Sequence, residues 1–285
     1  MKRIVVLLLM LIFAFSGCKV FFVSEPPNQS EEYNYATDVN GELVPVHENV
    51  SESTLDPRQF SFDQDGRVIY SDPEISLIHG IDVSVFQGDI DWNKVKADGI
   101  DFAMIRIGFR GYGTQGKMQI DNNFYRNYSG AVAAGLKVGV YFYSQAINAA
   151  EAREEAAFIL NTLGDRELSF PIAYDWEYVD VDGARTALMT SSQITECANA
   201  FCDEIMKSGR EVIIYFNREI GYFEYELSVI DHYDFWLAEY YEYPSFIYEY
   251  KIWQYTDKGI VDGIEGNVDL NVSLVDYSEN SDSFG

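Results

Sequence analysis

Two carboxylates stand two residues apart near the middle of the chain, in the stretch PIAYDWEYVD (residues 171–180). Asp175 and Glu177 end an apolar run that is typical of a buried strand. Because the side chains of a strand alternate between its two faces, both acids point to the same side. Two like charges on one face of a buried strand cost free energy, and each raises the proton affinity of the other. Such a pair suits general acid–base chemistry, in which one carboxyl carries a proton and the other a negative charge.

Two further acids, Asp82 and Asp269, lie in strand-like segments to either side of this pair. Taken singly, each has an ordinary interpretation: Asp82 as a cap of a helix or turn, and Asp269 as a solvated loop acid. If all four acids meet, they form a carboxylate cluster that has no histidine or cysteine partner. Such a cluster favours the hydrolysis of a glycosidic bond over acyl transfer or metal-dependent hydrolysis.

Aromatic residues gather near the ends of the same strand-like segments. Their rings are candidates for flat platforms on which sugars stack, although core packing is the alternative explanation for about half of them. A few polar residues are weaker candidates for hydrogen bonds to a sugar. The aromatic candidates are Tyr141, Tyr143, Tyr215, Trp236, Tyr240, Trp253 and Tyr255, and the polar candidates are Gln87, Arg106 and Gln254.

Short apolar segments alternate with helical ones from Gly80 onward, which predicts a parallel sheet. The helical candidates lie between the first five strands, and few helices follow the fifth. Eight strands in this arrangement predict an α/β fold, an irregular TIM-like (β/α) barrel with about five helices and a helix-poor last third. The strand candidates are residues 80–84, 102–108, 137–143, 170–177, 211–217, 234–240, 250–256 and 267–271, and the helix candidates are 91–99, 121–135, 148–164 and 191–209.

A closed barrel would bring the four acids together. Active sites of such barrels lie at the C-terminal ends of the strands, and the first and last strands are neighbours. Asp82 on the first strand should therefore meet Asp269 on the eighth. Asp175 and Glu177, at the end of the fourth strand, should lie across the barrel mouth.

The first residues predict export. Lys2 and Arg3 precede an apolar run over residues 4–15, which is too short to span a bilayer but suits a secretory signal peptide over residues 1–17. The following FSGC resembles a bacterial lipobox, in which Cys18 becomes the lipidated first residue. An ordinary signal peptide with an incidental Cys18 is the alternative. We therefore expect an exported bacterial lipoprotein, held on the extracytoplasmic face of the membrane by an N-terminal lipid anchor.

The remaining sequence divides by composition. Residues 18–58 are acidic and weak in pattern, which predicts a flexible tether. Residues 59–78 alternate around Asp65-Gly66 and predict a small hairpin. Residues 79–278 then form the barrel domain, and residues 279–285 a C-terminal tail.

Charge and cysteine content limit the partners. A formal net charge of −26 disfavours binding to nucleic acid or to anionic lipid. Three cysteines give no disulfide framework, and Cys197 and Cys202 are expected to be small core thiols. The three histidines are scattered, without metal-ligand spacing. No obligate protein partner is evident from the sequence.

Six stretches together resemble the family 25 glycoside hydrolases, the Chalaropsis-type lysozymes. They are GIDVSVFQGDIDWNKVKADGIDFAMIRIG, VGVYFYS, PIAYDWE, FWLAEY, KIWQYT and GNVDLN, and they span residues 79–275. The resemblance implies an incomplete β/α barrel without a metal or organic cofactor. It also implies hydrolysis of the β-1,4 bond between N-acetylmuramic acid and N-acetylglucosamine in the glycan strands of peptidoglycan.

The resemblance also implies roles for the four acids. Glu177 would be the general acid, and Asp175 would stay ionised and either stabilise the oxocarbenium-like transition state or orient the N-acetyl group of the substrate. Asp82 and Asp269 would hold the sugar and balance the charge of the cleft. The family suggests retention through the N-acetyl oxygen, whereas the spacing of the two acids in sequence does not choose between retention and inversion.

Two other functions compete with this one. A non-catalytic cell-wall glycan-binding lipoprotein could use the same fold, although the intact acids argue against it. A metal-dependent polysaccharide deacetylase would need histidine and aspartate ligands near the acids, and the sparse histidines speak against that.

Overall fold

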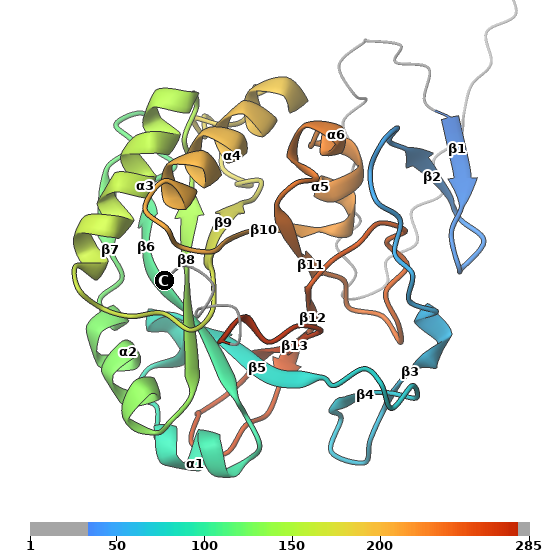
Figure 1. Ribbon diagram of the computed structural model, residues 1–285. Coiled ribbons are helices and arrows are strands. Elements are labelled where there is room, and N and C mark those ends of the chain that lie inside the picture. Colours follow the sequence, from blue (N-terminus) through green and yellow to red (C-terminus); the bar gives the residue numbers. More distant parts are fainter. Residues whose placement is uncertain (1–33, 279–285) are drawn as a thin grey trace, which may run out of the picture. The chain divides into compact units, whose positions relative to one another are not determined.

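Eight strands close into a barrel in the computed structural model, which describes residues 34–278 (Figure 1). The expected α/β barrel is therefore confirmed. Residues 1–33 and 279–285, including Cys18, the proposed signal peptide and the tail, lie outside the described residues. In order around the barrel the strands are β5 (Ile78–Val83), β6 (Phe102–Arg110), β8 (Lys137–Ser144), β9 (Ile172–Trp176), β10 (Val212–Asn217), β11 (Asp234–Ala238), β12 (Ile252–Gly259) and β13 (Val268–Ser273).

The direction of the last strand differs from the expected parallel sheet. Neighbouring strands from β5 to β12 run parallel, but β13 is antiparallel to both β12 and β5. No helix separates β12 from β13, and a short connection permits only an antiparallel pair. The start of β13, which carries Asp269, therefore lies at the same end of the barrel as the C-terminal ends of the other strands. We call this end the mouth.

The barrel has two separate apolar layers. Phe102, Met104 and Ile213 fill its interior, whereas alternate residues of the same strands, such as Ile105 and Ile214, pack outward. Gly80 makes room for this filling, since a Cβ there would lie 2.2 Å from the Phe102 ring. The interior thus consists of side chains packed from the bottom upward, and polar residues follow towards the mouth.

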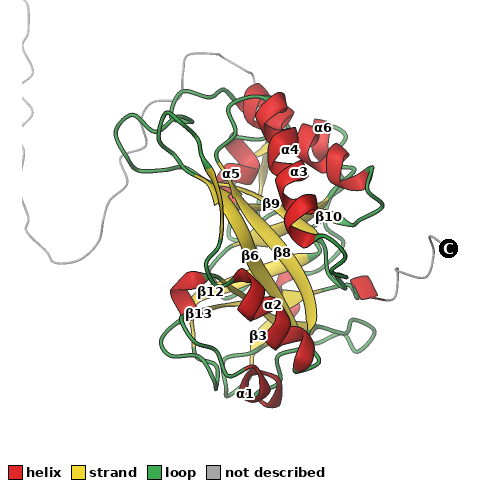
Figure 2. Ribbon diagram, turned by 90° about the vertical axis from the view of Figure 1, so that its left-hand side faces the viewer, coloured by secondary structure: helices red, strands yellow, loops and turns green. Residues whose placement is uncertain are grey.

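Helices cover one side of the barrel. Figure 2 shows α2, α3 and α4 outside the strands, where they contact β6, β8, β9 and β10. Asn148 caps α3 by accepting from the main-chain N–H of Glu151. The short α5, α6 and β7, which pairs with the end of β6, were not anticipated. The elements are α1 (Trp92–Ala97), α2 (Phe124–Ala133), α3 (Ala149–Leu163), α4 (Ser191–Met206), α5 (Arg218–Phe223), α6 (Leu227–Ile230), β7 (Met118–Ile120), η1 (Pro57–Gln59) and η2 (Val85–Gln87).

Residues 34–77, which we call the N-terminal extension, lie against the side of the barrel that has few helices (Figure 1). The hairpin β1 (Asn34–Thr37)–β2 (Leu43–Val46) contacts α5, and the segment after it pairs with residues 247–249. The expected hairpin within 59–78 is present as β3 (Phe60–Phe62) and β4 (Val68–Tyr70).

The flexible tether expected over residues 18–58 is wrong for residues 34–58. Val44 and Asp38 are buried, and Ser53 N–H donates to the carbonyl of Ile247. The physical reason is the partner surface: β12 turns Trp253 outward where no helix covers it, and the extension supplies the missing cover. The prediction of a tether relied on the acidic composition of this segment and gave no weight to the few apolar residues that make this contact.

Two further features concern the described residues alone. Within residues 34–278, no helix combines the length and apolar character needed to cross a membrane. Cys197 and Cys202 are free buried thiols on α4, as expected.

Candidate active site

Asp82 and Asp269 face each other across the seam that closes the barrel. They are direct register partners of the antiparallel pair β5–β13. Asp82 is only 6% exposed, and its Oδ2 accepts hydrogen bonds from Gln254 Nε2 and Asn271 Nδ2, both at 2.8 Å. Burial raises the pKa of Asp82, while burial together with the charge and hydrogen bond of Asp82 raises the pKa of Asp269 to about 9. The two carboxyls therefore hold a proton between them at neutral pH.

Asp175 lies inside the barrel at the end of β9, beside Tyr143 on β8 and Tyr215 on β10. Its side chain is buried, and its Oδ1 has no hydrogen-bond donor among the described residues. Burial and then the charge of Glu177 raise the pKa of Asp175 well above its usual range, against the opposing charge of Arg106. The resemblance implies an ionised Asp175, and burial and the charge of Glu177 act against that ionisation within the barrel.

Glu177 follows β9 directly and is half-buried. Burial raises its pKa, and a hydrogen bond from the Tyr215 hydroxyl lowers it. The main-chain carbonyl of Glu177 accepts from Gln145 Nε2 at 3.2 Å, and Thr186 donates to the other end of the same amide at 2.8 Å. This buried amide fixes the backbone that carries the acid.

Arg106 brings a positive charge into the barrel. Its Nη2 lies 2.7 Å from Asp121 Oδ2, and its guanidinium lies 5.0 Å from the centre of the exposed Phe86 ring. Asp121 is buried and also accepts from the main-chain N–H of Val85. The charge of Arg106 opposes the burial that raises the pKa of Asp175. Arg106, which was predicted as a polar contact, is therefore a cation at the mouth that is paired with Asp121 and stacked on Phe86.

Three tyrosines and a glutamine complete the wall. Tyr141, Tyr143 and Tyr215 come from inward-facing positions of β8 and β10, and the charges of the acids raise the pKa of each phenol further after burial. Gln254 Oε1 accepts from the Tyr240 hydroxyl at 2.7 Å and lies 3.1 Å from the Tyr215 hydroxyl, whose single proton goes either to this oxygen or to Glu177. Tyr240 is 48% exposed, so its ring is available to a ligand.

Three residues that were predicted to bind sugar have no side-chain surface available for it at the mouth. Trp253 faces outward, because Gln254 next to it faces inward, and it packs on Phe60 at 5.1 Å. Trp236 is inside but fully buried, with its Nε1 donating to Asn271 Oδ1 at 2.8 Å. Gln87 caps η2 by accepting from Ser84 N–H at 2.9 Å. Neighbouring side chains cover both indole rings, so neither ring can stack on a sugar. The amide oxygen of Gln87 already accepts the hydrogen bond from Ser84 N–H.

Two site residues were missed by sequence reasoning. Asn271 holds Asp82, and Asp121 holds Arg106. Asn271 stands two residues after Asp269 on one strand, so alternation could have placed both side chains on the inner face. Asp121 comes from a loop before α2, and no periodic pattern points to it.

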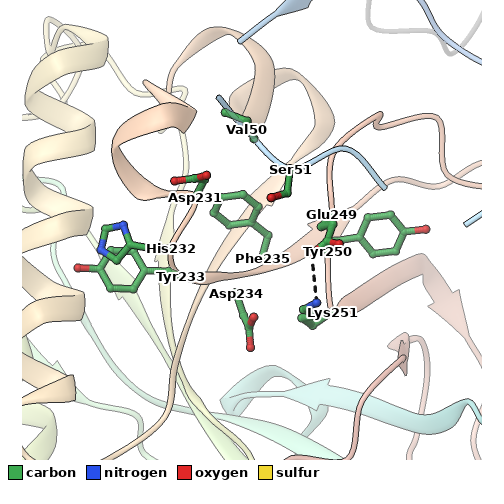
Figure 3. Close-up of a pocket in the computed structure, with 10 residues that line it drawn as sticks. All are labelled: Val50, Ser51, Asp231, His232, Tyr233, Asp234, Phe235, Glu249, Tyr250 and Lys251. Atoms are coloured by element: carbon green, nitrogen blue, oxygen red, sulfur yellow. Dashed lines mark hydrogen bonds and ion pairs between the residues drawn. The ribbon is translucent and has the colours of Figure 1, made fainter. Parts of the chain in front are cut away.

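A separate hollow lies at the opposite end of the barrel. Figure 3 shows it around Asp234, the first residue of β11, and Lys251, which immediately precedes β12. Three of its charged groups have partners: Lys251 pairs with Glu249 at 3.3 Å, and Tyr277 donates to Asp234 at 2.9 Å. The carboxylate cluster at the mouth is therefore the candidate site. Among residues 34–278, no three His, Cys, Asp or Glu side chains are placed to hold a metal ion.

The chain is similar to known proteins of one family. A family model described as "Glycosyl hydrolases family 25" matches residues 81–264. The autolytic lysozyme of Clostridium acetobutylicum is 31% identical over 194 residues, which are 67% of this chain and 54% of that protein. The chain thus spans about half the length of this curated relative.

Solved structures share the barrel. The modular autolysin LytC from Streptococcus pneumoniae, in complex with a synthetic peptidoglycan ligand, is 25% identical with a TM-score of 0.61, over 85% of this chain and 56% of that one. A family 25 glycosyl hydrolase from Bacillus anthracis is 22% identical with a TM-score of 0.59, over 75% of this chain and 95% of that one. The second likeness establishes the common fold.

Proposed function

Because the chain belongs to glycosyl hydrolases family 25, we propose that it is a lysozyme, an N-acetylmuramidase that cleaves the β-1,4 bond between N-acetylmuramic acid and N-acetylglucosamine in peptidoglycan. The observation that carries the proposal is the meeting of Asp82, Asp175, Glu177 and Asp269 at the barrel mouth, beside exposed tyrosine. The autolytic lysozyme and the autolysin with its peptidoglycan ligand support this substrate class.

Glu177 serves as the general acid in this proposal. It is the more accessible member of its pair, and burial raises its pKa, which favours the protonated form that a general acid needs. Asp82 and Asp269 keep their shared proton away from the reacting bond and bind sugar hydroxyls. Gln254 and Asn271 hold Asp82 in place through their amide N–H groups.

Asp175 receives the N-acetyl group of the substrate. Asp175 is 6% exposed, and the N–H of an acetamide would supply a donor to its carboxylate. That hydrogen bond stabilises the carboxylate, so substrate binding lowers the pKa of Asp175 and leaves the remaining proton on Glu177. Substrate binding in this way brings the pair to the state that the reaction needs, with Asp175 ionised and Glu177 protonated.

The bond changes follow from these roles. Glu177 donates its proton to the glycosidic oxygen as the C1–O bond breaks, and the acetamide carbonyl oxygen bonds to C1 from the opposite face. Asp175 accepts the acetamide hydrogen bond while positive charge develops on the ring. The Glu177 carboxylate then takes a proton from water, whose oxygen attacks C1 and displaces the acetamide oxygen. Two inversions give net retention.

We also propose the membrane anchor as part of the function. The apolar run over residues 4–15 and the FSGC sequence support export and lipidation at Cys18. An anchored enzyme would act on peptidoglycan near the extracytoplasmic face of the membrane. These residues lie outside the part of the chain that the structure describes.

Product analysis tests the activity. Full-length protein is incubated with purified peptidoglycan, and the soluble products are analysed by mass spectrometry after borohydride reduction. Muramidase activity predicts reduced N-acetylmuramic acid at new chain ends. Binding without new ends would indicate a glycan-binding protein, and release of acetate would indicate a deacetylase. Either result would overturn the proposal.

A further inference from the structure

A loop with two exposed tyrosines borders the carboxylate cluster. We call residues 239–246, which follow β11 directly, the Tyr240 loop. Tyr240 and Tyr241 are 48% and 66% exposed. The Tyr240 hydroxyl donates to Gln254, whose amide N–H donates to Asp82. The loop therefore reaches the acids through two hydrogen bonds, and it offers aromatic surface beside them.

The base of the Tyr240 loop is closed by one buried carboxylate. Glu239 accepts from the main-chain N–H of Ser245 at 2.9 Å, from the Ser245 hydroxyl at 2.6 Å and from the N–H of Phe246 at 3.2 Å. Its own N–H donates to the carbonyl of Gln254 at 3.1 Å. The direction in which Tyr240 leaves the barrel is thus fixed by how Glu239 is held.

The N-terminal extension holds Glu239 through Arg218. Arg218 follows β10 and lies with its Nη2 at 2.7 Å from Asp38 and its Nε at 3.7 Å from Glu239. The side chains of Asp38 and Glu239 are 0% and 1% exposed. A buried carboxylate is costly when unpaired, and Arg218 brings a positive charge to both acids, which also accept hydrogen bonds from main-chain N–H groups. Glu42 also pairs with Arg218 at 3.1 Å, but it is 65% exposed.

A second barrel residue that the extension contacts also reaches Glu239. Trp253 Nε1 donates to the main-chain carbonyl of Glu239 at 2.8 Å, and the Trp253 ring packs on Phe60 of β3. Arg218 and Trp253, which contact Glu239, belong to the barrel, and each is in turn contacted by a residue of the extension, Asp38 or Phe60, that precedes the family match at residue 81. The extension therefore acts on the loop base from two sides, through one barrel residue on each side.

We propose that the N-terminal extension is a working part of the glycan site, with Asp38, Arg218 and Glu239 acting as positioning residues that set the Tyr240 loop for a sugar of the peptidoglycan strand. This inference rests on the proposed function. None of the three needs to touch the substrate. Their effect passes through Tyr240, so it should appear in the affinity for glycan and leave the bond-breaking step largely unchanged.

Kinetics of full-length variants on soluble, uncrosslinked glycan strands test the inference. Asp38→Asn removes the charge but keeps the oxygen that accepts from Asn40 and Glu42 N–H in the turn. We expect KM to rise about 3- to 30-fold with kcat within about 2-fold of wild type. Glu42→Gln is the matched control, since its exposed ion pair should matter little, and its KM should change less than about 2-fold.

A double variant separates positioning from a general loss of stability. Tyr240→Ala should raise KM by itself, and Asp38→Asn should add less than about 2-fold to it if the extension acts through Tyr240. Additive effects, or an unchanged KM in Asp38→Asn, would overturn the inference. Arg218→Lys, which keeps one charge but cannot span both acids, gives a second test should Asp38→Asn fail to fold.

Wild-type turnover is the reference in every comparison. Its absence would count against the proposed function and not against the extension. Asp38→Asn, Tyr240→Ala and the double variant are then compared with wild type by their dissociation constants for the glycan strands, measured by titration calorimetry. The same pattern of coupling is expected there, and independence of Asp38 and Tyr240 would again overturn the inference.

Discussion

Asp175 lies on β9 and Glu177 directly follows that strand, and their surroundings differ. Asp175 is enclosed with an unpartnered oxygen, whereas Glu177 reaches the mouth and accepts a hydrogen bond from Tyr215. Burial raises the pKa of both carboxyls and so favours their protonated forms. A ligand that brings a donor to Asp175 therefore changes which of the two acids carries the proton.

Tyr215→Phe tests how Glu177 is tuned. The Tyr215 hydroxyl lowers the pKa of Glu177, so its removal should raise that pKa. A general acid works while protonated, and the alkaline limb of the pH profile of kcat/KM should therefore move to higher pH. Tyr143→Phe is the control, because no hydrogen bond from Tyr143 contributes to the pKa of Glu177. An alkaline limb that stays in place, or moves down, would contradict this role.

The N-terminal extension and the helix-poor wall of the barrel form one structural unit. β11 and β12 are not followed by helices of the usual length, and Phe60, Val44 and the paired segment around Ser53 cover their outer face instead. A barrel wall needs an apolar cover on its outside, whichever part of the chain supplies it. Truncation before residue 79 would expose that wall.

Phe60→Ala measures this cover. Phe60 is buried between Tyr70 and Trp253, so its loss should lower the free energy of unfolding by about 3 kcal/mol. Phe62→Ala on the same strand is the control, since Phe62 is 39% exposed and should cost about 1 kcal/mol or less. Chemical denaturation followed by tryptophan fluorescence gives both values. Equal, small effects would mean that the extension is a tether without a part in the fold.

Sequence periodicity was sufficient for the eight strands and for the first four helices, because apolar alternation and helix caps are local signals. It was insufficient for Trp253, whose direction depends on which face of β12 meets the barrel interior. Gln254 and Trp253 could not both have faced inward, so strand parity would have removed one of them. Residues 34–58 fold only against a surface made elsewhere in the chain, which no local pattern reports.

The whole molecule combines a strongly acidic chain with a cluster of buried acids. The formal net charge is −26, and the cleft adds carboxyls whose pKa values burial raises. Protons bound in the folded cleft and released on unfolding make stability depend on pH. The carboxylate cluster thus lowers stability at neutral and alkaline pH, as functional sites commonly do.

Asp269→Asn tests this linkage. The pKa of Asp269 is raised from 3.8 to about 9, so its contribution to stability is full below pH 4 and is lost as the pH rises towards 9. The amide does not titrate, and the variant should melt at least about 2 °C above wild type at pH 8 and show a smaller fall in Tm between pH 5 and 9. A parallel pair of Tm curves would contradict the raised pKa.

Cys18→Ala tests the anchor at the scale of the cell. Stable membrane attachment needs acyl chains, so wild-type protein should partition into the detergent phase of a Triton X-114 extract, and the variant into the aqueous phase. Cys197→Ala is the control, because that thiol is buried in the barrel domain. Equal partitioning of wild type and Cys18→Ala would remove lipidation from the account.

The central claim, that the carboxylate cluster is a muramidase site with Glu177 as its acid, is tested most directly by Glu177→Gln. The amide keeps the size of the side chain but cannot donate the acid proton, and general acid catalysis is worth about 10²–10⁴ in rate. Release of reducing N-acetylmuramic acid ends from peptidoglycan should therefore fall at least about 100-fold, while affinity for glycan strands and Tm stay close to wild type. Near-normal release of reducing ends by Glu177→Gln would contradict the claim.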